Sequence, residues 1–109
     1  MGQLYYGNTD LAVEIADALL AHVKVVTATK LRRGESFTLS WVHPDDAPVG
    51  RTTIWLQPAI PLRFVFESAE PEMLDPALLQ ELVNSANSSG GLSIDIVGAR
   101  EAARATLPA

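Results

Sequence analysis

The sequence predicts a single α+β domain, in which an antiparallel sheet carries two helices packed on one face. The chain has 109 residues, which is enough for one hydrophobic core and too few for two. Short stretches of alternating apolar and polar residues recur along it, and two longer stretches have the 3.6-residue period of a helix. The expected order is β-β-α-β-β-β-α-β over residues 1–98. Residues 99–109 are expected to form a tail, either a short helical turn or a frayed end.

The first two strands are expected to form a hairpin. Residues 3–6 are rich in β-forming side chains, and residues 11–15 alternate in the manner of a half-buried strand. Gly7 and Asn8 lie between them, and both residue types accept the positive φ angles of a tight turn. The sequence therefore begins with two antiparallel strands.

A helix is expected over residues 17–33. Asp17 can serve as its N-cap, and three basic residues fall in its last turn, where the helix dipole favours cations. Gly34 follows, as is typical of the position after a helix end. Residues 23–29 include a β-branched run that favours a strand, but the signals at both ends decide for a helix.

The middle of the chain predicts an antiparallel meander. Its three strands are residues 37–42, 53–57 and 62–67. A register that gathers the large aliphatic side chains on one face sets Trp41 opposite Ile54, Leu39 opposite Leu56, and Leu56 opposite Phe64. The predicted core face consists of Phe37, Leu39, Trp41, Ile54, Leu56, Leu62, Phe64 and Phe66.

A second helix begins at Pro76, with Asp75 as its N-cap, because a proline in the first helical position loses no hydrogen bond. Its buried stripe falls within residues 78–86, and residues 88–91 (Ser-Ser-Gly-Gly) end it. The polar cluster at this end is interpreted as capping groups, with a ligand loop built on Ser-Ser-Gly-Gly as the alternative; its members are Asn84, Ser85, Asn87, Ser88 and Ser89. Residues 92–97 alternate and predict a last strand.

Trp55 is the unusual residue on the opposite, polar face of the predicted meander. Exposing a tryptophan forgoes about 2–3 kcal/mol of burial. Either the N-terminal hairpin or a second small core covers it, or it anchors a partner, because aromatic and arginine residues are enriched at binding hot spots. Ser40 and Val65 are its expected cross-strand neighbours. The candidate binding residues are Trp55, Arg51, Arg63, Ser40, Val65 and Gln57.

The formal net charge is -5, yet residues 24–63 have a local balance of +3. A basic segment in an acidic chain can attract an anion, and the candidate anion-binding residues are Lys30, Arg32 and Arg33. The alternative is that they serve the helix end or a solvated surface. A nucleic-acid accessory role would use these three residues together with Arg51 and Arg63. The acidity of the whole chain opposes tight binding of phosphates.

Several chemistries are excluded by the residues present. The chain has no cysteine, so it forms no disulfide, thiolate zinc site, iron–sulfur cluster or cysteine nucleophile. It contains no Walker A, GxGxxG, GxSxG or HExxH motif. His22 is expected near the surface of the first helix, and His43 precedes Asp45 and Asp46 in a turn with too few ligands for a metal. We therefore predict no catalytic residues, no metal site and no cofactor.

The composition also bears on location. No apolar run approaches the ~18 residues of a membrane span. The first residues lack the basic and apolar regions of a signal peptide. The expectation is a cytoplasmic protein with no membrane partner.

Parts of the sequence resemble a known family. The resemblance is carried by residues 1–7 (MGQLYYG), 30–37 (KLRRGESF), 40–41 (SW), 51–62 (RTTIWLQPAIPL) and 84–92 (NSANSSGGL). These segments resemble a family of small uncharacterised actinobacterial proteins, and the resemblance covers residues 1 to about 97. Members of that family often carry the label "ATP-dependent DNA ligase". Such an enzyme uses a lysine nucleophile in a Lys-x-Asp-Gly context, and neither Lys24 nor Lys30 stands in one.

The leading functional prediction is a non-enzymatic binding or assembly module, expected to form a homodimer through the open sheet face around Trp55. The nucleic-acid accessory role is the second prediction. An activity related to the ligase label is a remote third.

Overall fold

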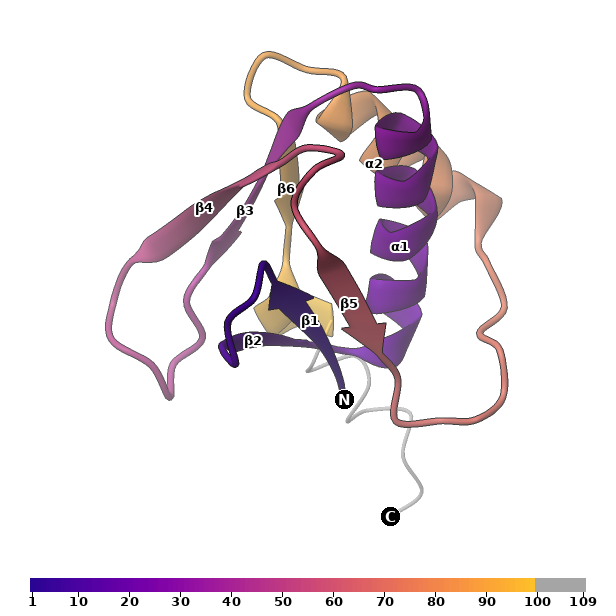
Figure 1. Cartoon of the computed structure of the whole chain (residues 1–109). Coiled ribbons are helices and arrows are strands. Elements are labelled where there is room, and N and C mark those ends of the chain that lie inside the picture. The colour runs from indigo at the N-terminus through magenta and orange to yellow at the C-terminus, as the bar shows by residue number, and fades with distance from the viewer. Residues whose placement is uncertain (100–109) are drawn as a thin grey trace.

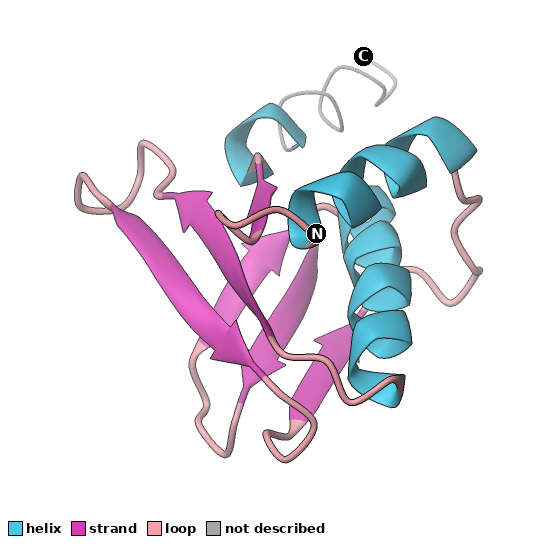
Figure 2. Ribbon diagram, turned by 90° about the horizontal axis from the view of Figure 1, so that it is seen from above, coloured by secondary structure: helices cyan, strands magenta, loops and turns pink. Residues whose placement is uncertain are grey.

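The computed structural model describes residues 1–99 and confirms the α+β class and the order of elements (Figure 1). The elements are β1 (Gly2–Tyr6), β2 (Ala12–Ile15), α1 (Asp17–Arg32), β3 (Phe37–Val42), β4 (Arg51–Leu56), β5 (Leu62–Val65), α2 (Pro76–Ala86) and β6 (Leu92–Ile94). A further helical segment covers Ile96 to Ala99. The expectation for the rest of the tail, residues 100–109, falls outside the described residues. Figure 2 shows α1 and α2 together on one side of the strands.

The strands divide between two three-stranded sheets, where the sequence analysis expected one. Their orders are β2-β1-β5 and β4-β3-β6. The predicted pairing of β4 with β5 is wrong, because β5 pairs with β1 and sets Leu4 opposite Phe64. Two prolines, Pro58 and Pro61, limit the hydrogen bonds of the connection, and Gly7 N–H donates to the Pro61 oxygen at 2.9 Å. The connection thus takes the chain from one sheet to the other.

The register of β3 and β4 differs from the prediction by two residues. Leu39 lies opposite Ile54, and Trp41 lies opposite Thr52. His43 N–H donates to the Gly50 oxygen at 2.8 Å, and this bond continues the ladder into the connecting loop. Because side chains alternate with a period of two, the shift leaves every residue on its predicted face.

β6 runs parallel to β3 and is shorter than predicted, since it ends at Ile94. The Asp95 carboxylate accepts the Gly98 N–H at 2.8 Å, and the Asp95 carbonyl accepts the Ala99 N–H at 3.1 Å. Asp95 therefore begins a helical segment where alternation predicted more strand. The alternating pattern did not detect this capping interaction.

α1 has its predicted extent but not its predicted N-cap. Ala16 occupies the N-cap position, and no side chain caps the helix. The Asp17 carboxylate instead accepts the backbone N–H groups of Glu67 and Ser68, both at 3.1 Å, which ties the end of β5 to the start of α1. At the other end Gly34 has a φ of 75° and donates to the Leu31 oxygen, as predicted for the residue after the helix.

α2 begins as predicted, because the Asp75 carboxylate accepts the Ala77 N–H at 3.0 Å and Pro76 follows it. The expectation that His22 lies near the surface is wrong, because His22 is 2% exposed. Its Nε2 accepts the Asp75 N–H at 2.8 Å, and its Nδ1 lies 2.5 Å from the Ala18 oxygen. The neutral ring with its proton on Nδ1 satisfies both bonds and fastens the start of α2 to α1.

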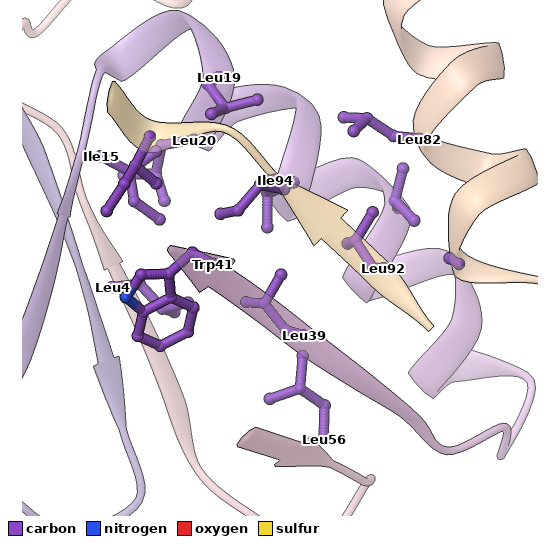
Figure 3. Packing of buried hydrophobic residues seen from close by; sticks show 14 of the residues in the cluster. Leu4, Ile15, Leu19, Leu20, Leu39, Trp41, Leu56, Leu82, Leu92 and Ile94 are labelled. Atoms are coloured by element: carbon purple, nitrogen blue, oxygen red, sulfur yellow. The ribbon is translucent and has the colours of Figure 1, made fainter. Parts of the chain in front are cut away.

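The hydrophobic core lies between the two sheets and the two helices (Figure 3). The predicted core face is confirmed, since four of its members are buried and the other four pack against the core. The buried four are Phe37, Leu39, Trp41 and Leu56. Elements outside the predicted meander contribute further buried residues, including Leu4, Ile15, Leu20, Leu82, Leu92 and Ile94.

Candidate functional site

Trp55 projects from β4 into solvent and is 53% exposed. Its Cα partner on β3 is Thr38. The N-terminal hairpin does not cover the indole; it reaches the residue through the hydroxyl of Tyr6, which donates to the Trp55 carbonyl oxygen at 2.6 Å. That carbonyl points away from β3, so Tyr6 occupies the outer edge of β4 at this position. The indole ring of Trp55 is therefore exposed to solvent, whereas its backbone carbonyl is hydrogen-bonded to Tyr6.

The outward side chains of β3 and β4 form one polar surface, which we name the Trp55 face. Its members are Thr38, Ser40, Val42, Arg51, Thr53 and Trp55. Figure 1 shows the β3–β4 hairpin extending away from the other elements. Val42, Arg51, Thr53 and Trp55 are exposed on this face, whereas Thr38 and Ser40 are half-buried. At its centre the hydroxyls of Ser40 and Thr53 are hydrogen-bonded at 2.7 Å.

A groove of about 340 Å³ borders the Trp55 face. It is lined by Lys30, Ser36, Phe37, Thr38, Trp55, Ala86, Asn87, Ser88, Ser89 and Gly91. This volume is at the lower end of the range for small-molecule sites. The groove brings together Trp55, the basic residue Lys30 and the Ser88–Gly91 loop, which sequence reasoning treated as separate features.

The loop beside Trp55 is held by its own hydrogen bonds. Ser88 Oγ donates to the Ser85 oxygen at 2.7 Å, while Ser85 Oγ donates to the Gly91 oxygen at 3.2 Å and accepts the Ser93 N–H at 3.1 Å. Gly91 has a φ of 76°, and a Cβ there would overlap the side chain of Thr38. These contacts support the predicted capping role and give the groove a fixed wall.

Lys30 is already engaged by neighbouring groups. Its ammonium donates to Asn87 Oδ1 at 2.8 Å, lies 3.7 Å from a Glu35 oxygen, and sits 5.6 Å from the centre of the Phe37 ring. The side chain is 12% exposed. The Lys30 ammonium therefore links the C-terminal ends of α1 and α2. Of the three predicted anion-binding residues, only Arg32 and Arg33 are exposed.

The structure brings only part of the predicted binding set together. Arg51 and Ser40 share the Trp55 face, and Gln57 directly follows the strand that carries Trp55. Arg63 and Val65 belong to the other sheet, where the Arg63 guanidinium lies 4.2 Å from the centre of the Tyr5 ring. The cross-strand neighbour of Trp55 is Thr38, so the expected neighbours Ser40 and Val65 are wrong.

His43 organises the β3–β4 loop. Its Nε2 lies 2.6 Å from Thr52 Oγ1, and its Nδ1 lies 2.9 Å from the Pro48 oxygen. Both ring nitrogens thus have partners in the hairpin. Among residues 1–99, no group of three His, Cys, Asp or Glu side chains is placed to hold a metal ion.

A larger cavity of about 750 Å³ lies between the start of α1, α2 and β6. Its lining is mainly apolar and includes Leu19, Leu78, Leu82, Ile94 and Ala99. None of the residues predicted to bind a partner lines it. In the part of the chain that is described, no helix has the length and apolar character needed to cross a membrane.

Sequence reasoning missed the partners of Trp55 in the groove, Ser36, Thr38 and Asn87. The one available signal was the density of Asn, Ser and Gly at residues 84–91, but no pattern linked that loop to β4. The groove combines an aromatic ring with hydroxyl and amide groups, which can stack on a ligand and form hydrogen bonds with it.

A family model described as a domain of unknown function (DUF7882) matches residues 1–96. The match covers most of the chain, so the protein belongs to this family. Membership of a small uncharacterised family was expected from the sequence and is confirmed; the ligase label is not part of the family's description. No match was found among curated proteins or among solved structures.

Proposed function

We propose that this member of a family of unknown function is a non-enzymatic assembly module that binds a second copy of itself through the Trp55 face. The observation that carries the proposal is the 53% exposure of Trp55 on the outward face of the β3–β4 hairpin. A protein interface gains most from large aromatic side chains that lose their contact with water on binding. A cytoplasmic location is part of the proposal, because a chain without cysteine needs no oxidising compartment.

The packing of the remaining large apolar side chains of the sheet supports this choice. The inward residues of β3 and β4 are buried or packed against the core, so the hairpin already has one satisfied face. Trp55 and Val42 are the exposed hydrophobic residues of its other face, with Val42 66% exposed. Trp55 lies beside Thr38 and Val42 lies beside Arg51, at opposite ends of this face. Trp55 is therefore the one large anchor of the proposed interface, with hydroxyl groups around it.

The nucleic-acid alternative has less support. Of the five basic residues it would use, Lys30 contacts Asn87 and Glu35, and Arg63 lies against Tyr5. The remaining residues, Arg32, Arg33 and Arg51, lie on two separate elements, at the end of α1 and at the start of β4. A continuous basic stripe is the usual electrostatic signature of phosphate binding.

Sedimentation velocity over a concentration series tests the proposal. The wild type should form dimers, and Trp55→Ala should weaken dimerisation by about 2 kcal/mol, roughly 30-fold. Met73→Ala is the matched control, because Met73 is 92% exposed and lies outside the Trp55 face. A monomeric wild type at millimolar concentration, or equal effects of the two variants, would contradict the proposal. Binding of a DNA oligonucleotide that weakens steeply with salt would favour the alternative.

The non-enzymatic part has its own test. Incubation with radiolabelled ATP and magnesium should leave no acid-stable adenylate on Lys24 or Lys30. Lys24 lies 5.6 Å from the centre of the Phe66 ring, and Lys30 is held by Asn87 and Glu35. A stoichiometric amine-linked adenylate, located by mass spectrometry, would overturn this part of the proposal.

A further inference from the structure

Arg51, Thr53 and Trp55 project from the same side of β4, with Thr53 midway between the other two. Among residues 1–99, three other cations already lie near aromatic rings: Lys24 near Phe66, Lys30 near Phe37, and Arg63 near Tyr5. Within that same part of the chain the Arg51 side chain has no ion pair or ring contact, and no cation lies over Trp55. Within residues 1–99, the exposed Arg51 guanidinium and the Trp55 ring, the aromatic type that binds cations best, therefore have no cation–ring contact.

The two groups do not meet within one chain. Their Cα atoms are about 13 Å apart along the strand, and none of the cation–ring contacts among residues 1–99 joins Arg51 to Trp55. A twofold axis that lies in the plane between two facing sheets, perpendicular to β4, reverses the direction of the strand. If that axis passes beside Thr53, Arg51 of one copy faces Trp55 of the other, and the contact occurs twice.

We propose that two copies pack face to face in this way, with Thr53 at the axis and Arg51 of each over the Trp55 ring of the other. This inference rests on the proposed function and specifies its geometry. The residues at the centre favour close approach, since Ser40 and Thr53 are small and hydrogen-bonded to each other. Pairing along the edge of β4 is disfavoured, because Tyr6 occupies the carbonyl of Trp55 at that edge.

Mixing two variants tests the geometry directly. Homodimers of Trp55→Ala have lost both Arg51–Trp55 contacts, and so have homodimers of Arg51→Ala. A heterodimer of the two variants keeps one contact, between Arg51 of the first and Trp55 of the second. Sedimentation with one variant fluorescently labelled should show the mixed pair associating roughly 3- to 30-fold more tightly than either variant alone. Equal affinity of mixed and unmixed samples would overturn the geometry.

A cross-link provides a second measurement at the axis. The chain has no cysteine, so Thr53→Cys introduces a single thiol. Facing sheets lie about 10 Å apart, which suits a short bismaleimide reagent better than a direct disulfide. Thr53→Cys should cross-link into dimers faster than Val49→Cys, whose side chain lies fully exposed in the β3–β4 loop.

The outcomes separate this inference from the proposed function. If Trp55→Ala weakens dimerisation but the mixture gains nothing and Thr53→Cys cross-links no faster than Val49→Cys, the geometry is wrong and self-assembly through Trp55 stands. If the wild type is monomeric, both the proposed self-assembly and the face-to-face geometry are wrong. Tighter association of the mixture together with rapid cross-linking at Thr53 supports both.

Discussion

The two tryptophans of the β3–β4 hairpin lie on opposite faces and have opposite environments. Trp41 is 9% exposed and packs in the core with Leu39, whereas Trp55 is 53% exposed on the Trp55 face (Figure 3 shows the buried side). Both residues lie in regular strands of one sheet, and both have a threonine as their Cα partner. The difference shows that the burial of these two side chains depends on the face of the strand from which each projects, and not on the chemical type of the side chain.

The comparison also shows how differently the two faces are stabilised. The inner face gains from apolar contact with helices and with the second sheet. The Trp55 face instead has polar contacts such as the Ser40–Thr53 hydrogen bond, and the Tyr6–Trp55 hydrogen bond holds the adjoining edge of β4. A change on the inner face should therefore reduce stability, and one on the Trp55 face should reduce association.

The largest effect is expected from Trp41→Ala. Removing a buried indole leaves a cavity, and the free energy of unfolding should fall by about 3–5 kcal/mol. Trp55→Ala should cost about 1 kcal/mol in the monomer, because half of its side chain already contacts water. Urea denaturation of both variants at low protein concentration measures the two values. Equal losses of unfolding free energy in the two variants would contradict the prediction that only the inner face contributes strongly to stability.

Two glycines have similar backbone angles but differ in the space available for a side chain. Gly91 and Gly34 have φ angles of 76° and 75°, but a Cβ at Gly91 would meet Thr38 and one at Gly34 would meet nothing within 4 Å. Gly34→Ala should cost about 1–2 kcal/mol from backbone strain alone. Gly91→Ala should cost about 2–4 kcal/mol, since crowding adds to strain. Thermal unfolding of the two variants compares them, and a smaller loss at Gly91 would mean that the groove wall adapts.

His22 tests whether the core side of the molecule also depends on a buried polar contact. His22→Ala removes the acceptor of the Asp75 N–H and should lower the free energy of unfolding by about 1–3 kcal/mol. His22→Gln retains an acceptor oxygen and should cost less. Chemical denaturation gives both values, and hydrogen exchange at the Asp75 amide reports the bond itself. Unchanged exchange in His22→Ala would show that the bond contributes little.

The smallest effect is expected from an exposed ion pair away from both faces. A hydrogen bond to Glu67 raises the pKa of the Met1 ammonium above its ordinary value near 8.0. A raised pKa in the folded state adds stability below that ordinary value, and the gain is lost as the pH rises through the raised pKa. Glu67 is 73% exposed, so the contribution should be about 0.5 kcal/mol or less. Stability measured from pH 7 to 10 should decline less in Glu67→Gln than in wild type.

Trp55 and Lys30 were identified from the sequence, but their common groove was not. The alternation of side chains along β4 placed Trp55 on the face opposite to that of Ile54 and Leu56, and this alternation is a local property of a strand. The groove depends on α2 ending beside β3, where Gly91 contacts Thr38 and Asn87 binds Lys30. Contacts between residues more than 50 positions apart leave no periodic signal in a single sequence. For the same reason, the separation of Arg63 from Trp55 was not foreseen.

Local patterns in the sequence were enough to predict the α+β class, the order of the elements, the face of each side chain on β3 and β4, and the ends of α2. Each of these follows from local periodicity or from capping chemistry. Three features could not be predicted in this way: β5 pairs with β1, β6 runs parallel to β3, and His22 is buried beneath the start of α2. Those choices depend on which apolar faces can be buried together, and that is a property of the whole chain.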